Sequence, residues 1–469
     1  MISQGILVFE NASAMGDLMA LRFGGLSLVD RGIRTMVRAG LKRILVIVPA
    51  GAAPVPLSRI TRKLDISLEI VPWGTASDMQ FPAGEDFLLL VGDYVHHHSS
   101  LSEAMADGLG AADVVSLLSD SSQPDIPLRE VQLEGEAIRF REAVQSRDQL
   151  SSGVFLCAAA LAPQALATAA ADVWSFLSVR SAGRRAEARP GASPLWRRVA
   201  DRRTARDAKN MLFSQVTKKT SGPVSRHLNA RFSIPTSKLL IETGISPHMV
   251  TVLFVLTTGL TSAYLFSMPD NYLYLASGGI LWQLAAILDR CDGEVARVSL
   301  CESKFGAWFD TVTDNIAYLA MFAGTVVGMS RLHPGESLYI YVGISSLVSL
   351  VFSLILLYRY AIKTGSGSLQ HYHVGLKRDV PASEKGVVYA FVERHAYVVK
   401  RDFFAFVQFL LVILNQFELL YWLSMLTFHG LAFGILLSQR KMLAVHRARE
   451  QQPAPAAGLE AMSVAEDRR

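Results

Sequence analysis

The chain has 469 residues, of which 51% are hydrophobic and 19% charged, and its formal net charge is +5. This length exceeds a single typical domain, so at least two domains are expected. The small net charge, without an array of interleaved aromatic and basic residues, argues against nucleic-acid binding. Cys157, Cys291 and Cys301 form no CxxC pair and fit a reducing compartment. The amino-terminal residues show no basic start followed by an apolar core, so no cleavable signal peptide is expected.

The amino-terminal half alternates short strand-like and helix-like segments. This alternation predicts an α/β, Rossmann-like domain on a largely parallel sheet, which we place at residues 1–205. Strands are expected at 6–9, 43–48, 66–71, 87–91, 114–118 and 154–156, and amphipathic helices at 27–39 and 100–106. His96, His97 and His98 are expected in a polar loop, because consecutive side chains seldom point at one metal.

Two stretches of this half resemble sugar-phosphate nucleotidyltransferases. Residues 23–31 (FGGLSLVDR), followed by 39–47 (AGLKRILVI), are similar to the segment after the nucleotide loop of that family. Residues 88–93 (LLLVGD) are similar to the strand that ends in the family's metal-binding aspartate, which implies such a role for Asp93. The resemblance implies a nucleotidyltransferase-like fold.

The same half departs from that family at its phosphate and metal sites. A glycine-rich turn with a basic residue holds the nucleotide phosphates in such enzymes, but residues 10–17 (ENASAMGD) carry acidic residues instead. The second metal-binding aspartate is expected near residues 196–202, where Asp201 stands out of register. We therefore predict a degenerate domain, kept for regulation, assembly or acceptor binding.

The segment that follows is predicted to connect two domains. Residues 180–206 are rich in Arg and Ala and predict a mobile, solvated connection. Residues 206–244 are interpreted as a linker that ends in a juxtamembrane amphipathic helix lying on the bilayer.

Long apolar runs occur only in the second half, and they predict a six-helix, all-α transmembrane domain at residues 245–442. A disordered tail is expected at 443–469. Basic residues gather beside spans two, four and six, so the positive-inside rule places both termini in the cytoplasm of a multi-pass cell-membrane (inner-membrane) protein. The six spans are expected at about 249–268, 272–288, 305–329, 338–361, 403–417 and 419–438.

Four aspartates lie at the cytoplasmic edge of spans two and three. Asp289 and Asp292 are three residues apart on one helix, and Asp310 and Asp314 are four apart on the next, so each pair projects from one helical face. Carboxylates beside a bilayer are costly without a partner or a function, and facing pairs of hard oxygen ligands suit a divalent cation such as Mg²⁺. Helix capping could explain Asp289 or Asp292, but Asp310 and Asp314 lie inside an apolar run.

The pattern D-x2-D-G-x2-A-R-x8-G-x3-D-x3-D resembles the signature of CDP-alcohol phosphotransferases at every defined position. These integral membrane enzymes transfer a phosphoalcohol group from a CDP-alcohol to a second alcohol and release CMP. The resemblance covers about residues 223–442 and implies a homodimer in the bilayer with two Mg²⁺ or Mn²⁺ ions per site. The implied metal ligands are Asp289, Asp292, Asp310 and Asp314, with Asp314 also the general base. The implied nucleotide-binding residues are Asp289, Gly293, Ala296, Arg297 and Gly306.

Basic residues after span four are candidates for binding a phosphate on the acceptor, although membrane topology alone could explain them. They are Lys363, Lys377, Arg378 and Arg394. The fusion of the two domains resembles bifunctional proteins that make CDP-inositol and then di-myo-inositol phosphate phosphate, which implies inositol phosphate as the acceptor. The alternatives are a phospholipid synthase that uses CDP-diacylglycerol, or a catalytically inactive membrane scaffold or binding protein.

Overall fold

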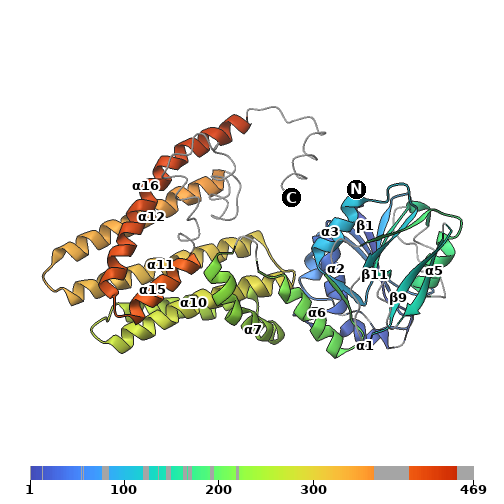
Figure 1. Ribbon diagram of the computed structural model, residues 1–469, viewed down its shortest axis with the longest axis horizontal. Coiled ribbons are helices and arrows are strands. Elements are labelled where there is room, and N and C mark those ends of the chain that lie inside the picture. Colours follow the sequence, from blue (N-terminus) through green and yellow to red (C-terminus); the bar gives the residue numbers. More distant parts are fainter. Residues whose placement is uncertain are drawn as a thin grey trace. The chain divides into compact units, whose positions relative to one another are not determined.

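The chain forms two compact units in the computed structural model (Figure 1). The structure describes residues 2–363 and 401–450, apart from 13, 54, 56, 76–83, 120–125, 136, 144–148, 162–165, 167–171, 191–194 and 218–220. Unit 1 comprises Met1–Lys219, Ile234–Ile245 and Gly293–Cys301. Unit 2 comprises Thr220–Ser233, Ser246–Asp292 and Glu302–Arg469.

A mixed β-sheet forms the centre of unit 1. Its strands are β1 (Gln4–Val8), β4 (Arg43–Val48), β5 (Ser67–Pro72), β6 (Phe87–Val91), β8 (Val114–Ser119), β9 (Leu128–Glu134), β10 (Ala137–Ala143), β11 (Leu150–Cys157) and β12 (Ala186–Pro190). The order is β10-β9-β11-β6-β1-β4-β5, with β8 beside β11 and β12 beside β8. The α/β class is therefore confirmed.

The sheet is parallel from β6 through β1 and β4 to β5, and again where β12 pairs with β8. β1 pairs in parallel with β4 and β6, so that Ile6 lies opposite Leu45 and Leu89, and β4 pairs in parallel with β5. β11 runs antiparallel to β6, β8 and β9. The expectation of a largely parallel sheet is thus wrong for the half that holds the β9–β10 hairpin.

Helices cover the sheet, and alternate side chains of each strand enter opposite cores. Leu7 and Phe9 lie in one core, whereas Ile6 and Val8 lie in the other. The main helices of unit 1 are α1 (Met15–Ala20), α2 (Leu28–Arg38), α3 (His98–Asp107), α5 (Val173–Ser181) and α6 (Arg202–Ser214). Ser27 caps α2 by accepting a hydrogen bond from the Asp30 N–H at 3.2 Å.

The described residues of the segment 180–206 form regular elements, which corrects the prediction of a mobile connection. It contributes β12 to the sheet, and β13 (Trp196–Arg198) pairs antiparallel with β7 (Tyr94–His96). The indole of Trp196 is only 1% exposed. α6 then buries the apolar residues Ala205, Ala208, Met211, Leu212 and Phe213 in the core of unit 1. The predicted domain boundary at residue 205 therefore falls inside a packed helix.

The three consecutive histidines do not form the loop expected for them. His96 ends β7, His97 is the N-cap of α3, and His98 begins that helix. The His96 side chain is buried, and its Nε2–H donates to the Ser152 carbonyl at 2.8 Å.

Acidification should destabilise unit 1 through His96. Burial lowers the pKa of His96 from its ordinary 6.5 to about 4. As the pH falls between these values, the unfolded chain binds a proton that the folded protein excludes, so the free energy of unfolding decreases. The loss at this one site is up to roughly 3 kcal/mol. Thermal unfolding of the full chain against pH measures it. His96→Gln should weaken the dependence without abolishing it, because burial also lowers the pKa of His97 to about 4. An unchanged dependence would contradict the assignment.

Unit 2 consists of helices, and the following elements make it up. They are η3 (Val224–Asn229), the start of α7 (Ala230–Leu240), α8 (Pro247–Val250), η5 (Thr251–Leu256), α9 (Thr257–Phe266), α10 (Tyr272–Val298), α11 (Lys304–Leu332), α12 (Ser337–Lys363), α15 (Arg401–Ile413) and α16 (Phe417–Glu450). α7 continues into unit 1, and the last residues of α10, from Gly293, also belong to unit 1.

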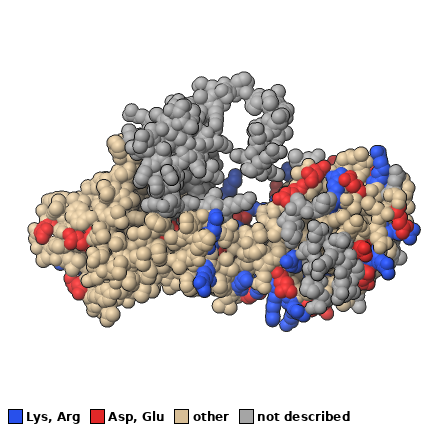
Figure 2. Space-filling view, in the orientation of Figure 1, with Lys and Arg blue, Asp and Glu red and all other residues tan. Residues whose placement is uncertain are grey.

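Within the described ranges, four helical segments are long and apolar enough to cross a membrane. They are Pro247–Phe266, Lys304–Leu332, Ser337–Arg359 and Phe417–Leu436. Asp402–Ile413 is a shorter apolar helix, and α10 is not among the four, so the count of six spans stays a prediction. On the face that Figure 2 shows, most of the visible surface of the helical part is uncharged, and its charged side chains gather toward its two ends. α16 continues to Glu450, so the predicted disordered tail is helical at its start.

Close helix packing fixes the position of α11 in unit 2. A Cβ atom on Gly324 would lie 2.0 Å from the Ala263 carbonyl oxygen, and one on Gly328 would lie 2.2 Å from that of Phe266. These glycines are one turn apart on α11, so only hydrogen atoms separate its backbone from α9, as in small-residue packing of membrane helices. The helix that carries Asp310 and Asp314 is therefore held rigidly.

Candidate metal and phosphotransfer site

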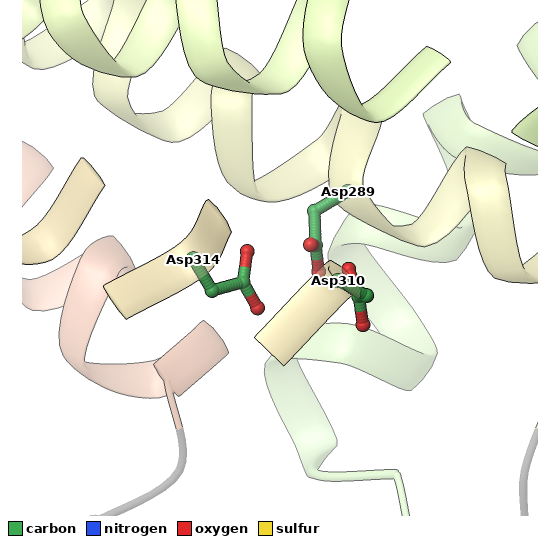
Figure 3. Close-up of side chains that lie close together, drawn as sticks. All are labelled: Asp289, Asp310 and Asp314. Atoms are coloured by element: carbon green, nitrogen blue, oxygen red, sulfur yellow. The ribbon is translucent and has the colours of Figure 1, made fainter. Parts of the chain in front are cut away.

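Three aspartates from two helices of unit 2 come together at one point (Figure 3). Asp289 projects from α10, whereas Asp310 and Asp314 project from successive turns of α11. One carboxylate oxygen from each residue can be chosen so that all three lie within 4.8 Å of one another. All three residues are partly exposed, so an ion or a substrate can reach them.

The distances in this cluster fit a divalent cation. Two carboxylate charges within 4.8 Å of each other repel by at least about 3 kcal/mol at an effective dielectric constant of 20. Oxygens that share one Mg²⁺ lie at most about 4 Å apart, because each Mg–O bond is about 2 Å long. Small side-chain rotations would therefore bring the three carboxylates onto one ion or onto two ions that share them. The donors are all hard oxygens, the type that Mg²⁺ and Mn²⁺ prefer.

Asp292, the fourth predicted ligand, is not part of this group. It lies one turn after Asp289 on α10 and is only 7% exposed. The Thr251 hydroxyl donates to Asp292 Oδ2 at 2.5 Å. A carboxylate has several lone pairs, so this bond leaves capacity to bind a cation. Sequence reasoning missed Thr251, because nothing in the spacing of η5 marks one threonine as the partner of an aspartate on another helix.

Gly306 lies at the start of α11, where packing explains the missing side chain. A Cβ atom there would lie 3.1 Å from His248 Cε1 and 3.1 Å from Ser303 Oγ. Ser303 caps the helix by accepting a hydrogen bond from the Gly306 N–H at 2.9 Å. The His248 ring packs edge-on against Phe309, with the ring centroids 5.4 Å apart. Nucleotide binding at Gly306 stays a prediction.

Gly293 and Arg297 are matched to each other on α10. A Cβ atom on Gly293 would lie 3.1 Å from Arg297 Nη1 and 3.4 Å from Nη2, so the glycine makes room for the guanidinium. Asp289, Gly293 and Arg297 are spaced by four residues and therefore share one face of the helix. Ala296 lies on the same turn as Arg297. The close approach of the Arg297 guanidinium to Gly293 gives a physical reason for a glycine at this position. The sequence pattern alone does not supply that reason.

The candidate acceptor residues cannot be compared with this site. Lys377, Arg378 and Arg394 lie outside the described residues. Lys363 is the last residue of α12, and its side chain is also outside the description. Their role stays a prediction.

Unit 1 contains an ion pair at the position where the nucleotidyltransferase resemblance implied a metal. Asp93 is 2% exposed, and Arg198 on β13 donates from Nε to its Oδ2 at 2.7 Å. Arg198 also donates to the Pro127 carbonyl. Burial raises the pKa of Asp93, and the positive charge of Arg198 opposes this shift. A guanidinium therefore neutralises the aspartate that the resemblance assigned to a metal.

The other acidic candidate in unit 1 is committed to a helix cap. Asp201 Oδ1 accepts a hydrogen bond from the Thr204 N–H at 2.8 Å, at the start of α6. The hydrogen bonds from Thr204 lower the pKa of Asp201. Of the residues that the structure describes, the only cluster with metal-ligand geometry is the one in unit 2.

Comparisons with known proteins find similarity in the region that contains the aspartate cluster. Residues 245–436 match the CDP-alcohol phosphatidyltransferase family. A "Bifunctional IPC transferase and DIPP synthase" of Rubrobacter xylanophilus is 26% identical over 324 residues, which cover 66% of this chain and 72% of the relative. A relative of the same name from Thermococcus kodakarensis is 39% identical over 27% of this chain and 29% of its own length. A "Phosphatidylinositol phosphate synthase" of Mycobacteroides abscessus is 33% identical over 23% of this chain and 46% of its own length.

Among solved structures, the inositol-1-phosphate CTP transferase from T. maritima resembles this chain over 45% of its residues and 96% of that protein. The TM-score is 0.35 and the identity is 15%, a level at which the likeness supports no conclusion about function.

The apolar helices and the family match define a membrane-associated transferase. The chain contains a CDP-alcohol phosphatidyltransferase domain at residues 245–436, preceded by an α/β sheet domain. The expected resemblance to CDP-alcohol phosphotransferases is thereby confirmed.

Proposed function

We propose that this protein is an integral membrane, metal-dependent CDP-alcohol phosphotransferase that uses inositol phosphate as its acceptor and releases CMP. The convergence of Asp289, Asp310 and Asp314, inside the region that matches the family, carries the proposal. Several relatives are named as synthases of phosphatidylinositol phosphate or of archaetidylinositol phosphate. Both product names contain inositol phosphate, and they differ in the lipid part. The acceptor is therefore the common element, and the donor is what varies among them.

The aspartates would hold one or two Mg²⁺ or Mn²⁺ ions, which supply Lewis-acid stabilisation of the diphosphate charge. Asp289, Asp310 and Asp314 form the ligand set, with Asp292 adjacent on α10. Asp314 would accept the proton of the acceptor hydroxyl as that oxygen attacks the β-phosphorus of the CDP-alcohol. The new O–P bond forms while the bond from the β-phosphorus to the bridging oxygen breaks. That oxygen leaves with its electron pair as part of CMP.

Arg297 would bind the diphosphate of the donor. It shares a helix face with Asp289, and its guanidinium lies over Gly293. A planar guanidinium can donate two parallel hydrogen bonds to phosphate oxygens, a geometry that Lys cannot provide. The same face thus offers ligands for cations and a donor for the phosphates that those cations neutralise.

A membrane scaffold without activity is the competing function. It gives no reason to place three carboxylates together on helices of a membrane domain, where such groups are costly unless they are used. In unit 1, by contrast, Arg198 neutralises the buried Asp93, so the cost of burying that carboxylate gives no argument for a metal site. We propose that unit 1 lacks metal-dependent nucleotidyl transfer. A cytoplasmic site and a homodimer remain parts of the proposal.

CMP release by the purified full-length protein tests this function. CDP-inositol and CDP-diacylglycerol serve as donors, each with inositol or inositol phosphate as acceptor, in the presence of Mg²⁺, Mn²⁺ or a chelator. We expect release only with inositol phosphate and a metal, and the donor that works decides between a soluble phosphodiester and a phospholipid product. No release with either donor would favour the scaffold. Release with inositol but not with inositol phosphate would refute the acceptor.

A further inference from the structure

Two arginines of α2 are buried in unit 1 and donate to the backbone where α10 ends. Arg31 is 2% exposed and Arg34 is 3% exposed. Arg31 Nη1 donates to the Val298 carbonyl at 2.9 Å, and Arg34 Nη1 donates to the Ser299 carbonyl at 2.9 Å. All four residues belong to unit 1, because this unit includes Gly293–Cys301.

These bonds satisfy a need of the helix. The last carbonyl groups of an α-helix have no partner within it, and cations are favoured at this end because of the helix dipole. α10 ends at Val298, and Leu300 takes a positive φ of 51°, which turns the chain away from the helix. Arg31 and Arg34 therefore hold the helix end at two successive carbonyls.

Other bonds fix each guanidinium in place. Arg31 Nη2 donates to the Gly24 carbonyl at 2.9 Å, and Arg34 donates from Nε to Thr61 Oγ1 at 2.9 Å and from Nη2 to Ser58 Oγ at 2.7 Å. Burial, together with the nearby charge of Arg34, lowers the pKa of Arg31 to about 9. Burying two cations side by side costs free energy, so another interaction or a function must offset that cost.

The surrounding chain is shaped to receive the end of α10. Val295 and Val298 are buried in the core of unit 1. Gly24 has a φ of +54°, and a Cβ atom there would lie 2.7 Å from Arg31 Nη2 and 3.1 Å from Val298 Cγ1. Ser237 on α7 donates to the buried carboxylate of Glu294 at 2.8 Å.

We propose that Arg31 and Arg34 are positioning residues that hold the end of α10 and thereby fix Gly293 and Arg297, which lie in the same unit, for binding the donor. The inference rests on the proposed function, because it takes Gly293 and Arg297 as residues of the donor site. The inference gives unit 1 a structural role, although Arg198 neutralises the Asp93 that could have held a metal ion there.

Cys301 provides a probe of the helix end that does not depend on activity. Its N–H donates to the Ala296 carbonyl at 3.0 Å, so the residue closes the last turn. Cys157 and Cys291 are buried, whereas Cys301 is partly exposed. The rate at which a thiol reagent labels the native protein therefore reports on opening at this position, and Cys301→Ser identifies the signal.

Arg34→Lys is the decisive variant, because it keeps the charge near Cys301 but its single nitrogen cannot span the three acceptors that Arg34 reaches with three nitrogens. Labelling of Cys301 should become several-fold faster, and the KM for the CDP-alcohol should rise about tenfold. Arg31→Lys should act in the same direction, while Arg38→Lys on the exposed end of α2 should change neither value. Thermal unfolding shows which variants are folded.

A folded Arg34→Lys protein with wild-type labelling would overturn the proposal, as would faster labelling with an unchanged donor KM. If the wild-type protein releases no CMP, the proposed function fails. Faster labelling of the variant would then still show that Arg34 holds the helix end.

Discussion

Replacing Asp310 or Asp314 by asparagine should reduce CMP release on the order of 10³-fold while the protein stays folded. Asparagine has nearly the same shape as aspartate, so the packing of α11 is retained. It loses the negative charge that binds a cation and the ability to accept a proton. Initial rates of CMP release, compared with the thermal unfolding of each variant, measure the effect.

The two positions should respond differently to the metal. If Asp310 acts mainly as a ligand, a higher Mn²⁺ concentration should restore part of the rate in Asp310→Asn. If Asp314 is the base, the metal should not restore Asp314→Asn, because the lost group accepts the proton. Asp270→Asn is a matched control, since this exposed residue lies in the turn before α10. A wild-type rate in either cluster variant would refute the site.

Removing the guanidinium of Arg198 should destabilise unit 1 by about 3–5 kcal/mol. Arg198→Met leaves Asp93 buried at 2% exposure without the cation that contacts it at 2.7 Å. Thermal unfolding of the full chain, supported by limited proteolysis, measures the change. Arg197→Met is the matched control, because adjacent residues of β13 point to opposite sides of the strand.

A second substitution tests the origin of that loss. Asp93→Asn removes the buried charge, so the double variant should be more stable than Arg198→Met alone, and the cycle yields the coupling between the two groups. Equal stability of Arg198→Met and the wild-type protein would show that the ion pair contributes nothing. It would also weaken the case that Arg198 replaces a metal beside Asp93.

The sequence predicts best those features that are local in the chain. Strands β4 and β6 match their predicted ranges, because central strands buried on both faces appear as continuous apolar runs. The β9–β10 hairpin was missed, since its apolar residues alternate with charged ones and one face is solvated. Residues 180–206 were misjudged for the same reason, because their arginines conceal buried positions such as Trp196.

The candidate site follows the same rule. Asp310 and Asp314 are one turn apart, so their shared face could be predicted from spacing. The hydrogen bonds that hold α10 join residues far apart in the sequence: Thr251 is 41 residues from Asp292, and Arg31 is 267 from Val298. Long-range contacts of this kind depend on the packing of whole elements, which no local pattern specifies.

Direct binding of Mn²⁺ tests the central claim that the aspartates of α10 and α11 form a metal site for CMP-releasing transfer. Electron paramagnetic resonance of free and bound Mn²⁺ can be recorded on the same samples that are assayed for CMP. The wild-type protein should bind Mn²⁺ over the concentration range in which CMP release rises, and Asp310→Asn should bind it more weakly and need more of it for activity. Full-rate CMP release after complete chelation, or undiminished Mn²⁺ binding when Asp289, Asp310 and Asp314 are all replaced by asparagine, would contradict the account.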